Sequence, residues 1–392
     1  MASEEIRVLV VDDSAVIRSL IADSIAATSG MKVVGQAEDG RRALEMLDAV
    51  RPDVITLDIQ MPRMDGLATL DAVLAKRPIP VIIVSSLTKL GAEITLDALD
   101  RGAVDYLAKP DYGAKTRAAL QEELPRKIRM AAGCDVRRIV EIRRGQRQRI
   151  AQRAAAQGTN STCGKPLSGH GPSDGRLSAA NHGGGLAASP AAAALAGKCI
   201  AIGISTGGPP ALAQLFAAIR PPMPPIVVVQ HMPPNFTKPL AWRLDSLSDL
   251  SVKEAASGDV LEPNHVLIAP GGKHLQVRRL GDVVKVVIRD GLPVSGHKPS
   301  VDVMMKSVAD AFAGVCLGVI MTGMGRDGAD GCQAIRAAGG YVIGQDEATS
   351  DVYGMNKVAH VEGHVDRQFA LDDAATVIAH QVRRLRGSLT AV

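Results

Sequence analysis

Aromatic side chains are scarce in this sequence of 392 residues, since Phe, Trp and Tyr together make up 2% of it. A chain so poor in aromatic residues lacks the stacking platforms that bind single-stranded nucleic acid. Its cores must be built from Val, Ile, Leu, Ala and Met, which suits buried parallel strands covered by helices. With 46% hydrophobic residues, the chain is long enough for two or three domains that each bury a core.

Cysteine is also sparse and shows no metal-binding or disulfide pattern. The five cysteines are odd in number, widely spaced and never arranged as CxxC. This pattern argues against a disulfide framework and against a zinc site, so we expect reduced, structural thiols. They are Cys134, Cys163, Cys199, Cys316 and Cys332.

Long apolar runs and a targeting segment are missing as well. No run approaches the roughly 20 apolar residues needed to cross a bilayer, and the opening MASEEIRVLVV has no basic region before its apolar stretch. We therefore expect a cytoplasmic protein without direct membrane insertion.

Positive charge is concentrated in one segment. The net charge is +4, but residues 126–153 hold ten Lys or Arg against two acids, a local charge of +8 that leaves −4 for the rest. This segment could be a helix, a tether to a partner or solvated charge, and solvated charge is the favoured interpretation. No nucleic-acid partner is expected.

The first 124 residues alternate short Val/Ile/Leu runs with helical patterns, which is typical of a βαβ succession. Ile17, Ile21 and Ile25 form one helical stripe. Five strands with intervening helices fit the flavodoxin-like doubly wound order. The expected strands are Ile6–Val11, Lys32–Ala37, Val54–Leu57, Val81–Ser85 and Asp105–Ala108.

A linker and a second alternating region follow. Residues 125–196 form a linker that is first basic and then rich in Gly, Ala and Ser. Its second part, residues 158–196, has no periodic apolar face, so we expect that part to be mostly disordered. Residues 197–388 alternate strand and helix patterns again. They include one probable hairpin that turns at Gly281-Asp282. The expected strands are CIAIGIS, PIVVVQH, HVLIAP, GVCLGVIMTG and GYVIGQ.

Polar residues end the strands of the first region. Asp12 and Asp13 follow the first strand, Asp58 ends the third, Ser85 the fourth, and Lys109 follows the fifth. The carboxyl ends of parallel strands line one crevice, and carboxylates gathered there suit Mg²⁺. A carboxylate can also attack a phosphoryl group while metal and lysine neutralise its oxygens. We therefore predict a phosphorylation site rather than a cluster of solvated acids.

A second set of strand ends carries hydrolytic chemistry. Gly203–Gly207 satisfies G-x-S-x-G and presents Ser205 on a strand–turn–helix. His231 ends the next strand, and Asp327 lies in a glycine-rich loop after another. Together they supply a nucleophile, a base and an orienting acid. The chain order Ser, His, Asp differs from that of α/β-hydrolases, so the same chemistry is expected on another doubly wound sheet.

Each of these three features has a simpler interpretation when taken alone. The glycine turn could equally cradle a phosphate, although a Walker A lysine is missing. His231 could be a structural histidine, and Asp327 could cap the helix that follows. Their common position past the carboxyl ends of strands in one predicted sheet favours catalysis.

The first region resembles a response-regulator receiver domain over its whole length, through VVDDSAVIR, LDIQMPRMDG, VSS and DYLAKP. The resemblance implies phosphorylation at Asp58 by a chemotaxis-type histidine kinase, with Lys109 beside the site. It also implies that Ser85 and Tyr106 relay the change. The implied Mg²⁺ ligands are Asp12, Asp13, Asp58 and the backbone of Gln60.

Residues 198 to about 370 resemble the catalytic domain of chemotaxis protein-glutamate methylesterases, the CheB family, through IGISTGG, VVVQHMP, LIAPGGKHL, GHKPSVDVMM, MTGMGRDG and QDEATSDVYGM. The resemblance implies that Ser205 is the nucleophile, His231 the base and Asp327 its partner. Thr206 and Met324 would border the oxyanion site. No cofactor is implied for ester hydrolysis.

The two resemblances imply a fold and a function. We expect two doubly wound α/β domains, a flavodoxin-like receiver over 1–124 and a Rossmann-like parallel-sheet methylesterase domain over 197–388. The enzyme would demethylate glutamate esters on the cytoplasmic helices of chemoreceptors, releasing methanol, and would deamidate glutamines there. In the family the unphosphorylated receiver packs over the catalytic crevice. A monomer is expected.

Some residues depart from the family pattern. Asn356 stands where proline is usual, and His360 and His364 stand where small apolar residues are common.

Two other functions compete with ester hydrolysis. A DNA-binding regulator is disfavoured because no helix-turn-helix follows the receiver. A phosphorylation-dependent scaffold with a vestigial triad is the second rival.

Overall fold

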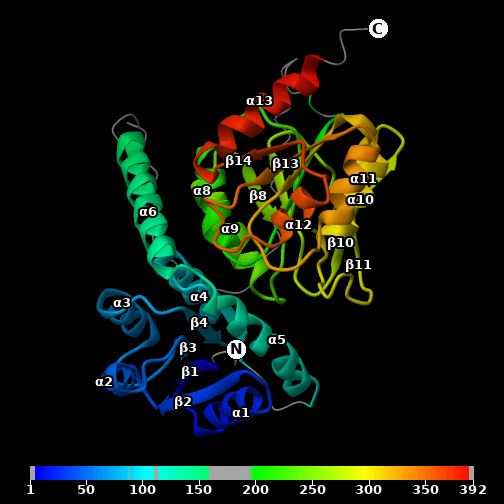
Figure 1. Ribbon diagram of the computed structural model, residues 1–392. Coiled ribbons are helices and arrows are strands. Elements are labelled where there is room, and N and C mark those ends of the chain that lie inside the picture. Colours follow the sequence, from blue (N-terminus) through cyan, green and yellow to red (C-terminus); the bar gives the residue numbers. More distant parts are fainter. Residues whose placement is uncertain (1–4, 87, 110–113, 159–194, 196, 388–392) are drawn as a thin grey trace, which may run out of the picture.

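We describe the chain from a computed structural model that places residues 5–86, 88–109, 114–158, 195 and 197–387. These residues form two α/β units, an N-terminal one and a C-terminal one (Figure 1). The Gly-, Ala- and Ser-rich part of the expected linker, residues 159–194, lies outside the described residues.

The N-terminal unit is built on a five-stranded parallel sheet. Its strand order is β2-β1-β3-β4-β5, which confirms the predicted flavodoxin-like arrangement. The strands are β1 (Ile6–Val11), β2 (Met31–Ala37), β3 (Val54–Asp58), β4 (Val81–Ser85) and β5 (Asp105–Ala108).

Helices cover both faces of this sheet. Helices α1 and α5 pack together, and α2, α3 and α4 form a second row. The stripe of Ile17, Ile21 and Ile25 is buried, as the sequence predicted. The helices are α1 (Ala15–Ala26), α2 (Gly40–Val50), α3 (Gly66–Lys76), α4 (Lys89–Arg101) and α5 (Ala114–Ala132).

Side-chain caps begin four of these helices. Ser14, Asp39, Asp65 and Thr88 each accept a hydrogen bond from a backbone N–H in the first turn of the helix that follows. Such caps satisfy amide groups that have no partner within the helix. They therefore define the residue at which each of these helices begins.

The basic segment is helical in the structure. After α5, the chain forms α6 (Val136–Gly158), which leaves the N-terminal unit and rises beside the C-terminal one (Figure 1). Helix α6 contacts α4 of the first unit and α8 (Gly208–Ala218) of the second. Solvated charge, the favoured interpretation of this segment, is wrong for Arg143, whose side chain is 3% exposed and pairs with Asp351.

The C-terminal unit contains a seven-stranded sheet in which every neighbouring pair is parallel. The strand order is β14-β13-β12-β6-β7-β9-β8. The five predicted strands are present, whereas the two edge strands, β8 and β14, were not predicted. The strands are β6 (Cys199–Ile204), β7 (Ile226–Gln230), β8 (Ser251–Glu254), β9 (His265–Ile268), β12 (Cys316–Ile320), β13 (Tyr341–Gln345) and β14 (Arg367–Phe369).

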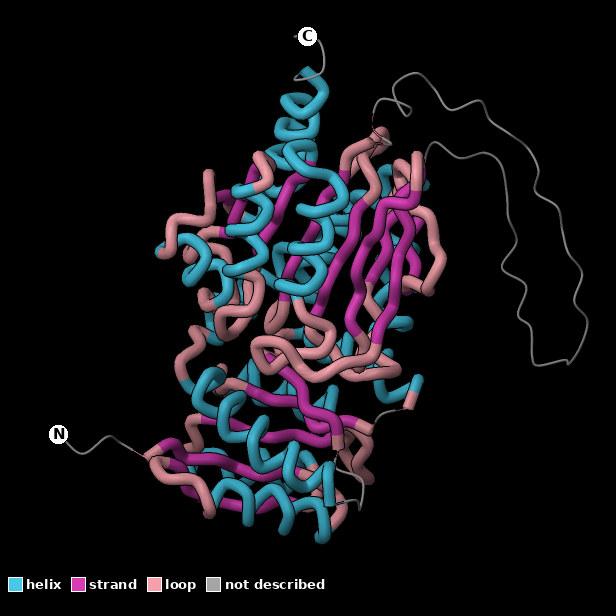
Figure 2. Tube along the Cα trace, turned by 90° about the vertical axis from the view of Figure 1, so that its right-hand side faces the viewer, coloured by secondary structure: helices cyan, strands magenta, loops and turns pink. Residues whose placement is uncertain are grey.

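Helices again lie on both sides of the sheet, as Figure 2 shows. Helices α8, α9 and α13 form one row and α10, α11 and α12 the other. The predicted hairpin is confirmed: β10 (His274–Leu280) and β11 (Val283–Arg289) pair antiparallel around Gly281-Asp282 and pack on α10. The remaining helices are α9 (Thr237–Leu247), α10 (Val301–Phe312), α11 (Ala329–Ala337), α12 (Met355–Val361) and α13 (Ala374–Gly387).

Apolar packing joins the two units. One cluster of buried side chains extends from the core of the N-terminal unit into the α8, α9 and α13 side of the second sheet, while a separate cluster fills the α10 side. Helix α4 packs on both α8 and α9. The N-terminal unit therefore rests on the second one at the face that includes the start of α8. Within the described residues, no helix combines the length and apolar character that crossing a membrane requires.

Candidate phosphorylation and active sites

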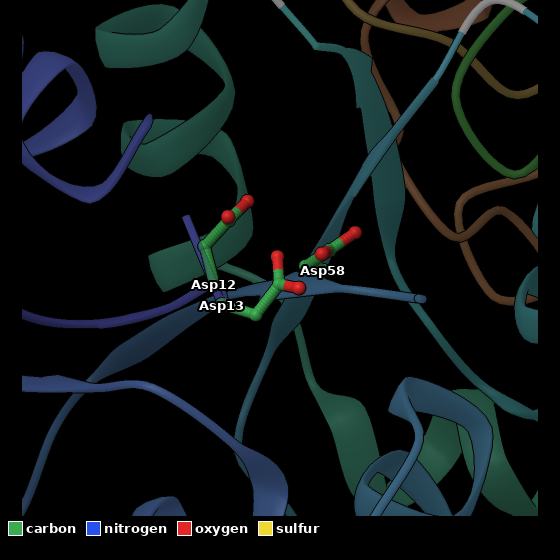
Figure 3. Close-up of side chains that lie close together, drawn as sticks. All are labelled: Asp12, Asp13 and Asp58. Carbon is green, nitrogen blue, oxygen red and sulfur yellow. The ribbon is translucent and has the colours of Figure 1, made fainter. Parts of the chain in front are cut away.

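Three carboxylates meet at the carboxyl ends of β1 and β3. Ligand oxygens of Asp12, Asp13 and Asp58 lie within 4.8 Å of one another (Figure 3). Asp12 and Asp58 are buried and Asp13 is exposed. Because β1 and β3 are adjacent strands, the fold itself brings these acids together.

Lys109 completes this cluster. Its Nζ lies 3.1 Å from Asp12 Oδ2 and 2.7 Å from Asp58 Oδ2. Burial raises the pKa of Asp12 and that of Asp58, and the ammonium group of Lys109 opposes both shifts. The backbone N–H of Gln60 donates to Asp58 Oδ1 at 3.3 Å, so that segment passes directly beside the cluster. Hard oxygen donors in this number fit Mg²⁺.

The two predicted relay residues lie on the neighbouring strands. Ser85, at the end of β4, is buried and donates its hydroxyl to the carbonyl of Gly91 at 3.2 Å. Tyr106, in β5, is also buried, and its ring stacks on Phe236 of the C-terminal unit with centroids 5.0 Å apart. Tyr106 therefore lies at the contact between the units.

Ser205 lies on a tight turn between β6 and α8. Gly207 has a φ of +76°, a conformation that side chains disfavour. A Cβ on Gly208 would lie 1.9 Å from Gln230 Oε1, so a side chain there would displace Gln230. Gln230 Nε2 in turn donates to the carbonyl of Ser205 at 2.9 Å, and the N–H of Ser205 donates to the carbonyl of Thr322 at 2.9 Å. The nucleophile turn is thus held from both sides.

His231 and Asp327 form a hydrogen-bonded pair. His231 Nε2 lies 2.8 Å from Asp327 Oδ2, and both side chains are largely buried. Asp327 also accepts bonds from the Ser300 hydroxyl and from the N–H groups of Val301 and Asp302. Burial alone would raise the pKa of Asp327, but the bond and charge of His231 and these N–H groups outweigh it and lower the pKa to about 2.

This pairing decides which ring nitrogen of His231 can act as a base. Because Asp327 is ionised, Nε2 carries the proton that the carboxylate accepts. Nδ1 is buried and has no hydrogen-bond partner among the described residues. Its lone pair is therefore available to accept a proton.

Ser205 and His231 line the same cavity, which has a volume of about 410 Å³. The predicted oxyanion neighbours, Thr206 and Met324, line it too. Ser205 follows β6, His231 follows β7, and Asp327 lies in the loop after β12; these three strands are neighbours in the sheet. The structure brings His231 and Asp327 into direct contact and places Ser205 on the wall of the cavity that His231 lines.

The N-terminal unit forms the opposite wall of this cavity. Thr206 Oγ1 donates to Asp105 Oδ2 of β5 at 3.0 Å, and Lys127 of α5 pairs with the same carboxylate at 3.0 Å. The hydroxyl of Thr206 is thus engaged by the first unit rather than facing an open crevice. The residues that the N-terminal unit and α5 contribute to the lining are Leu99, Asp105, Tyr106, Ala108, Glu122, Glu123, Arg126 and Lys127.

Several residues around the site have no predicted role from the sequence. Gln230 precedes His231 in a quoted motif, and His297 and Ser300 lie in GHKPSVDVMM, but no role was assigned to any of them. His297 stacks on His231 with ring centroids 3.8 Å apart. The GHKPSVDVMM motif could have indicated His297 and Ser300, since it places polar residues just before the helix that follows. No pattern in the sequence around Arg143 or Asp351 indicates that the two side chains pair.

The three residues that depart from the family pattern, Asn356, His360 and His364, lie outside the lining of the cavity. Asn356 is buried and donates to the Gln345 carbonyl and to the Ser350 hydroxyl, both at 2.8 Å. Helix α12 ends at Val361, and His364 lies 3.6 Å from Glu362. Among the described residues, the Asp12, Asp13 and Asp58 group is the one cluster suited to a metal ion, and neither histidine belongs to it.

Comparison with protein families identifies both units. Residues 200–378 match the model of the CheB methylesterase family, and residues 8–121 match that of the response regulator receiver domain.

Full-length relatives share this arrangement. The chain is 44% identical over 380 residues to a protein-glutamate methylesterase/protein-glutamine glutaminase of Treponema denticola, covering 96% of this chain and 98% of the relative. It is 41% identical to protein-glutamate methylesterase/protein-glutamine glutaminase 2 of Pseudomonas aeruginosa, covering 98% of each. The crystal structure of the Thermotoga maritima CheB methylesterase catalytic domain is 38% identical, with a TM-score of 0.47, covering 47% of this chain and 98% of that one.

Proposed function

The chain belongs to the CheB methylesterase family and carries a receiver domain ahead of its catalytic domain, and we propose that Ser205, His231 and Asp327 perform its hydrolysis. It is a protein-glutamate methylesterase and protein-glutamine glutaminase regulated by phosphorylation. The observation that supports the proposed residues is the His231–Asp327 hydrogen bond, which leaves Nδ1 without a described partner on a ring that lines the same cavity as Ser205.

The first half of the reaction transfers the glutamyl group to Ser205. His231 Nδ1 accepts the hydroxyl proton as Ser205 Oγ attacks the ester carbonyl carbon. Asp327 stabilises the imidazolium that forms. The carbon–oxygen bond to the methoxy group then breaks, and His231 returns the proton to the leaving oxygen, which departs as methanol. An amide substrate releases ammonia by the same step.

The second half returns the enzyme to its starting state. Water attacks the acyl-serine carbonyl while His231 Nδ1 accepts its proton. The bond to Ser205 Oγ breaks, Ser205 regains the proton from His231, and the free glutamate side chain leaves. The N-terminus of α8 follows directly on the nucleophile turn, where its backbone N–H groups favour negative charge on the carbonyl oxygen.

The receiver domain supplies the control. We assign phosphorylation to Asp58 by a chemotaxis-type histidine kinase, with Asp12, Asp13, Asp58 and the backbone of Gln60 as the residues that would hold Mg²⁺. When bound, the metal would neutralise charge on the phosphoryl oxygens. The substrate side chains would be those of chemoreceptor helices. We also propose a monomeric state and three segments: a receiver domain over 1–124, a linker over 125–196 and a methylesterase domain over 197–388.

A substitution of Ser205 tests the proposed mechanism. We expect Ser205→Ala to abolish methanol release from methylated receptor, because the acyl intermediate cannot form. Methanol is measured for the variant beside the parent, both with phosphodonor. Equal, measurable rates in the two proteins would exclude Ser205 as nucleophile, whereas no methanol release by either protein would favour the scaffold with a vestigial triad.

A substitution of Asp58 tests the control separately. Asp58→Asn removes the proposed phosphoryl acceptor but leaves the catalytic residues intact. We expect stimulation by phosphodonor to disappear while basal methanol release continues. Stimulation that persists in this variant would place the acceptor elsewhere.

A further inference from the structure

One ring near the active site has no part in the proposed chemistry. His297 lies in the loop between β11 and α10 and lines the catalytic cavity. Its imidazole lies flat on that of His231, with centroids 3.8 Å apart and planes 5° apart. The contact thus covers one face of the ring that must accept and return the proton.

The loop that carries His297 is held firmly. Val294 and His297 exchange two backbone hydrogen bonds, of 2.9 and 3.1 Å. Between them, Ser295 and Gly296 both have positive φ, of 52° and 78°, as a tight two-residue turn requires. Lys298 Nζ pairs with Asp290 at 2.8 Å. The position of the His297 ring is therefore set before substrate arrives.

The same segment also holds the acid of the triad. Three residues after His297, the Ser300 hydroxyl donates to Asp327 Oδ1 at 2.8 Å, and the N–H of Val301 donates to Oδ2 at 2.7 Å. Residues 297–301 therefore touch both His231 and Asp327. Asp327 restrains His231 in the plane of the ring through Nε2, and His297 restrains it perpendicular to that plane.

We propose that His297 is a positioning residue for the hydrolysis, whose flat ring fixes the plane of the His231 imidazole and keeps Nδ1 available to Ser205. The terminal torsion of a histidine is soft, so a hydrogen bond at one nitrogen still permits the ring to turn about that bond. A parallel ring in contact across the whole face blocks this rotation. This inference rests on the proposed roles of Ser205 and His231.

The electrostatic surroundings agree with this role. Burial, followed by the nearby His231, lowers the pKa of His297 to about 3, and Arg126 and Lys127 of α5 act in the same direction while Asp327 opposes them. In this arrangement His297 is thus neutral at any pH above about 4. A neutral aromatic face can stabilise the His231 imidazolium that forms during the reaction, whereas a second cation would oppose it.

Two substitutions separate the flat ring from the nitrogens. His297→Phe keeps a flat ring and lacks both nitrogens, and His297→Leu lacks the nitrogens and the flat ring. In the phosphorylated full-length enzyme we expect Leu to lower kcat about 10- to 100-fold with little change in KM, as a misplaced base would. Phe should remain within about 3-fold of the parent.

A second measurement tests the role of His297 without the receptor substrate. The rate at which a fluorophosphonate modifies Ser205 depends on activation of the serine, and we expect it to fall in parallel with kcat in the Leu variant and to be retained in the Phe variant. His265→Leu, at the start of β9 outside the cavity lining, serves as the matched histidine control. Thermal unfolding checks each fold, and His297→Ala replaces Leu where the latter does not fold.

Three outcomes would overturn the positioning role. They are a Leu variant with unchanged kcat, equal losses in the Phe and Leu variants, and a rise in KM alone, which would indicate a substrate contact. Full turnover by Ser205→Ala would overturn it too, but through failure of the underlying mechanism, and that result is obtained without any change at His297.

Discussion

At the scale of single residues, Asp327 is the most highly connected group of the active site. Its two oxygens accept bonds from His231, Ser300, Val301 and Asp302. These bonds point the carboxylate at His231 Nε2 and so determine which nitrogen of the ring remains basic. Orientation of the base therefore depends on one carboxylate that solvent does not reach.

Asp327→Asn should be nearly inactive. The amide has almost the volume of the carboxylate but cannot stabilise an imidazolium, and its NH₂ group would meet donors from Val301 or Asp302. We expect kcat to fall by about 10²- to 10⁴-fold with KM less affected, measured as methanol release by the phosphorylated enzyme. An Asn variant with parental kcat would show that His231 needs no anionic partner.

The pH dependence of the reaction should contain no contribution from Asp327 or His297 between about pH 5 and 8. Asp327, with a pKa of about 2, stays ionised, and His297, with a pKa of about 3, stays neutral at any pH above about 4. We therefore expect His297→Phe to leave the shape of the kcat/KM profile over this range unchanged, measured as methanol release from methylated receptor. A profile that loses a protonation step in that variant would contradict a neutral His297.

At the scale of elements, helix α6 is tied to the catalytic domain by a buried ion pair. Arg143 pairs with Asp351, and both side chains are at most 5% exposed. Asp351 also packs under the nucleophile turn, since a Cβ on Gly207 would lie 2.4 Å from its Oδ2. The connecting helix thus reaches the underside of the turn that carries Ser205.

Removing Arg143 should destabilise the catalytic domain in a pH-dependent way. Burial already raises the pKa of Asp351, and Arg143→Met would raise it further by taking away the opposing charge. Loss of one partner of a buried pair costs about 3–5 kcal/mol. Because the folded protein then binds the Asp351 proton more tightly than the unfolded chain, the deficit should be largest at neutral pH and shrink toward about pH 4.

Urea unfolding of two further variants completes this test. Arg144→Met changes the neighbouring, exposed arginine and should leave the free energy of unfolding within about 0.5 kcal/mol of the parent. Adding Asp351→Asn to Arg143→Met should recover part of the loss, since no buried charge remains. A deficit of equal size in the Arg144 variant, or one independent of pH, would contradict the role of the pair.

At the scale of the whole molecule, the receiver domain covers the active site. Asp105 holds the Thr206 hydroxyl and is paired with Lys127, while Tyr106 stacks on Phe236. An apolar cluster continuous through both domains supports these contacts. Since receiver residues line the cavity of Ser205, we propose that a substrate helix displaces the receiver and that this arrangement is the inhibited one.

Asp105→Asn should raise the basal activity. The substitution removes the charge that holds Lys127 and weakens the bond to Thr206, so the closed arrangement loses stability relative to the open one. We expect methanol release by the unphosphorylated enzyme to rise about 3- to 10-fold, with little change after phosphorylation. Asp48→Asn, in an exposed receiver ion pair with Lys76, is the control. Unchanged basal activity would mean that Asp105 does not contribute to closure.

Removal of metal ions should affect the proposed phosphorylation site and leave the hydrolytic site unaffected. The Asp12, Asp13 and Asp58 cluster fits Mg²⁺, whereas the ester hydrolysis needs none of those groups. We expect excess chelator to abolish stimulation by a small-molecule phosphodonor and to leave basal methanol release unchanged. Asp13→Asn should weaken stimulation in the same way. Loss of basal activity on chelation would contradict this division.

Element prediction succeeded where the signal is local. The central strands are continuous apolar runs, and the α1 stripe has helical spacing, so neighbours within a few residues suffice to identify them. The edge strands β8 and β14 were missed because they are short and mostly polar, with one fully buried side chain each. Pairing with β9 and β13 makes them strands, and that information lies elsewhere in the chain.

The sequence by itself determined both α/β sheets, the acidic strand ends and the presence of serine, histidine and aspartate at carboxyl ends, because each depends on a few consecutive residues. Only the tertiary structure decided that His231 meets Asp327 through Nε2, that His297 covers the ring, and that Asp105 takes the Thr206 hydroxyl. The side chains that make these contacts lie 66 to 101 residues apart in the sequence. Their geometry follows from strand order and domain packing, which no local pattern encodes.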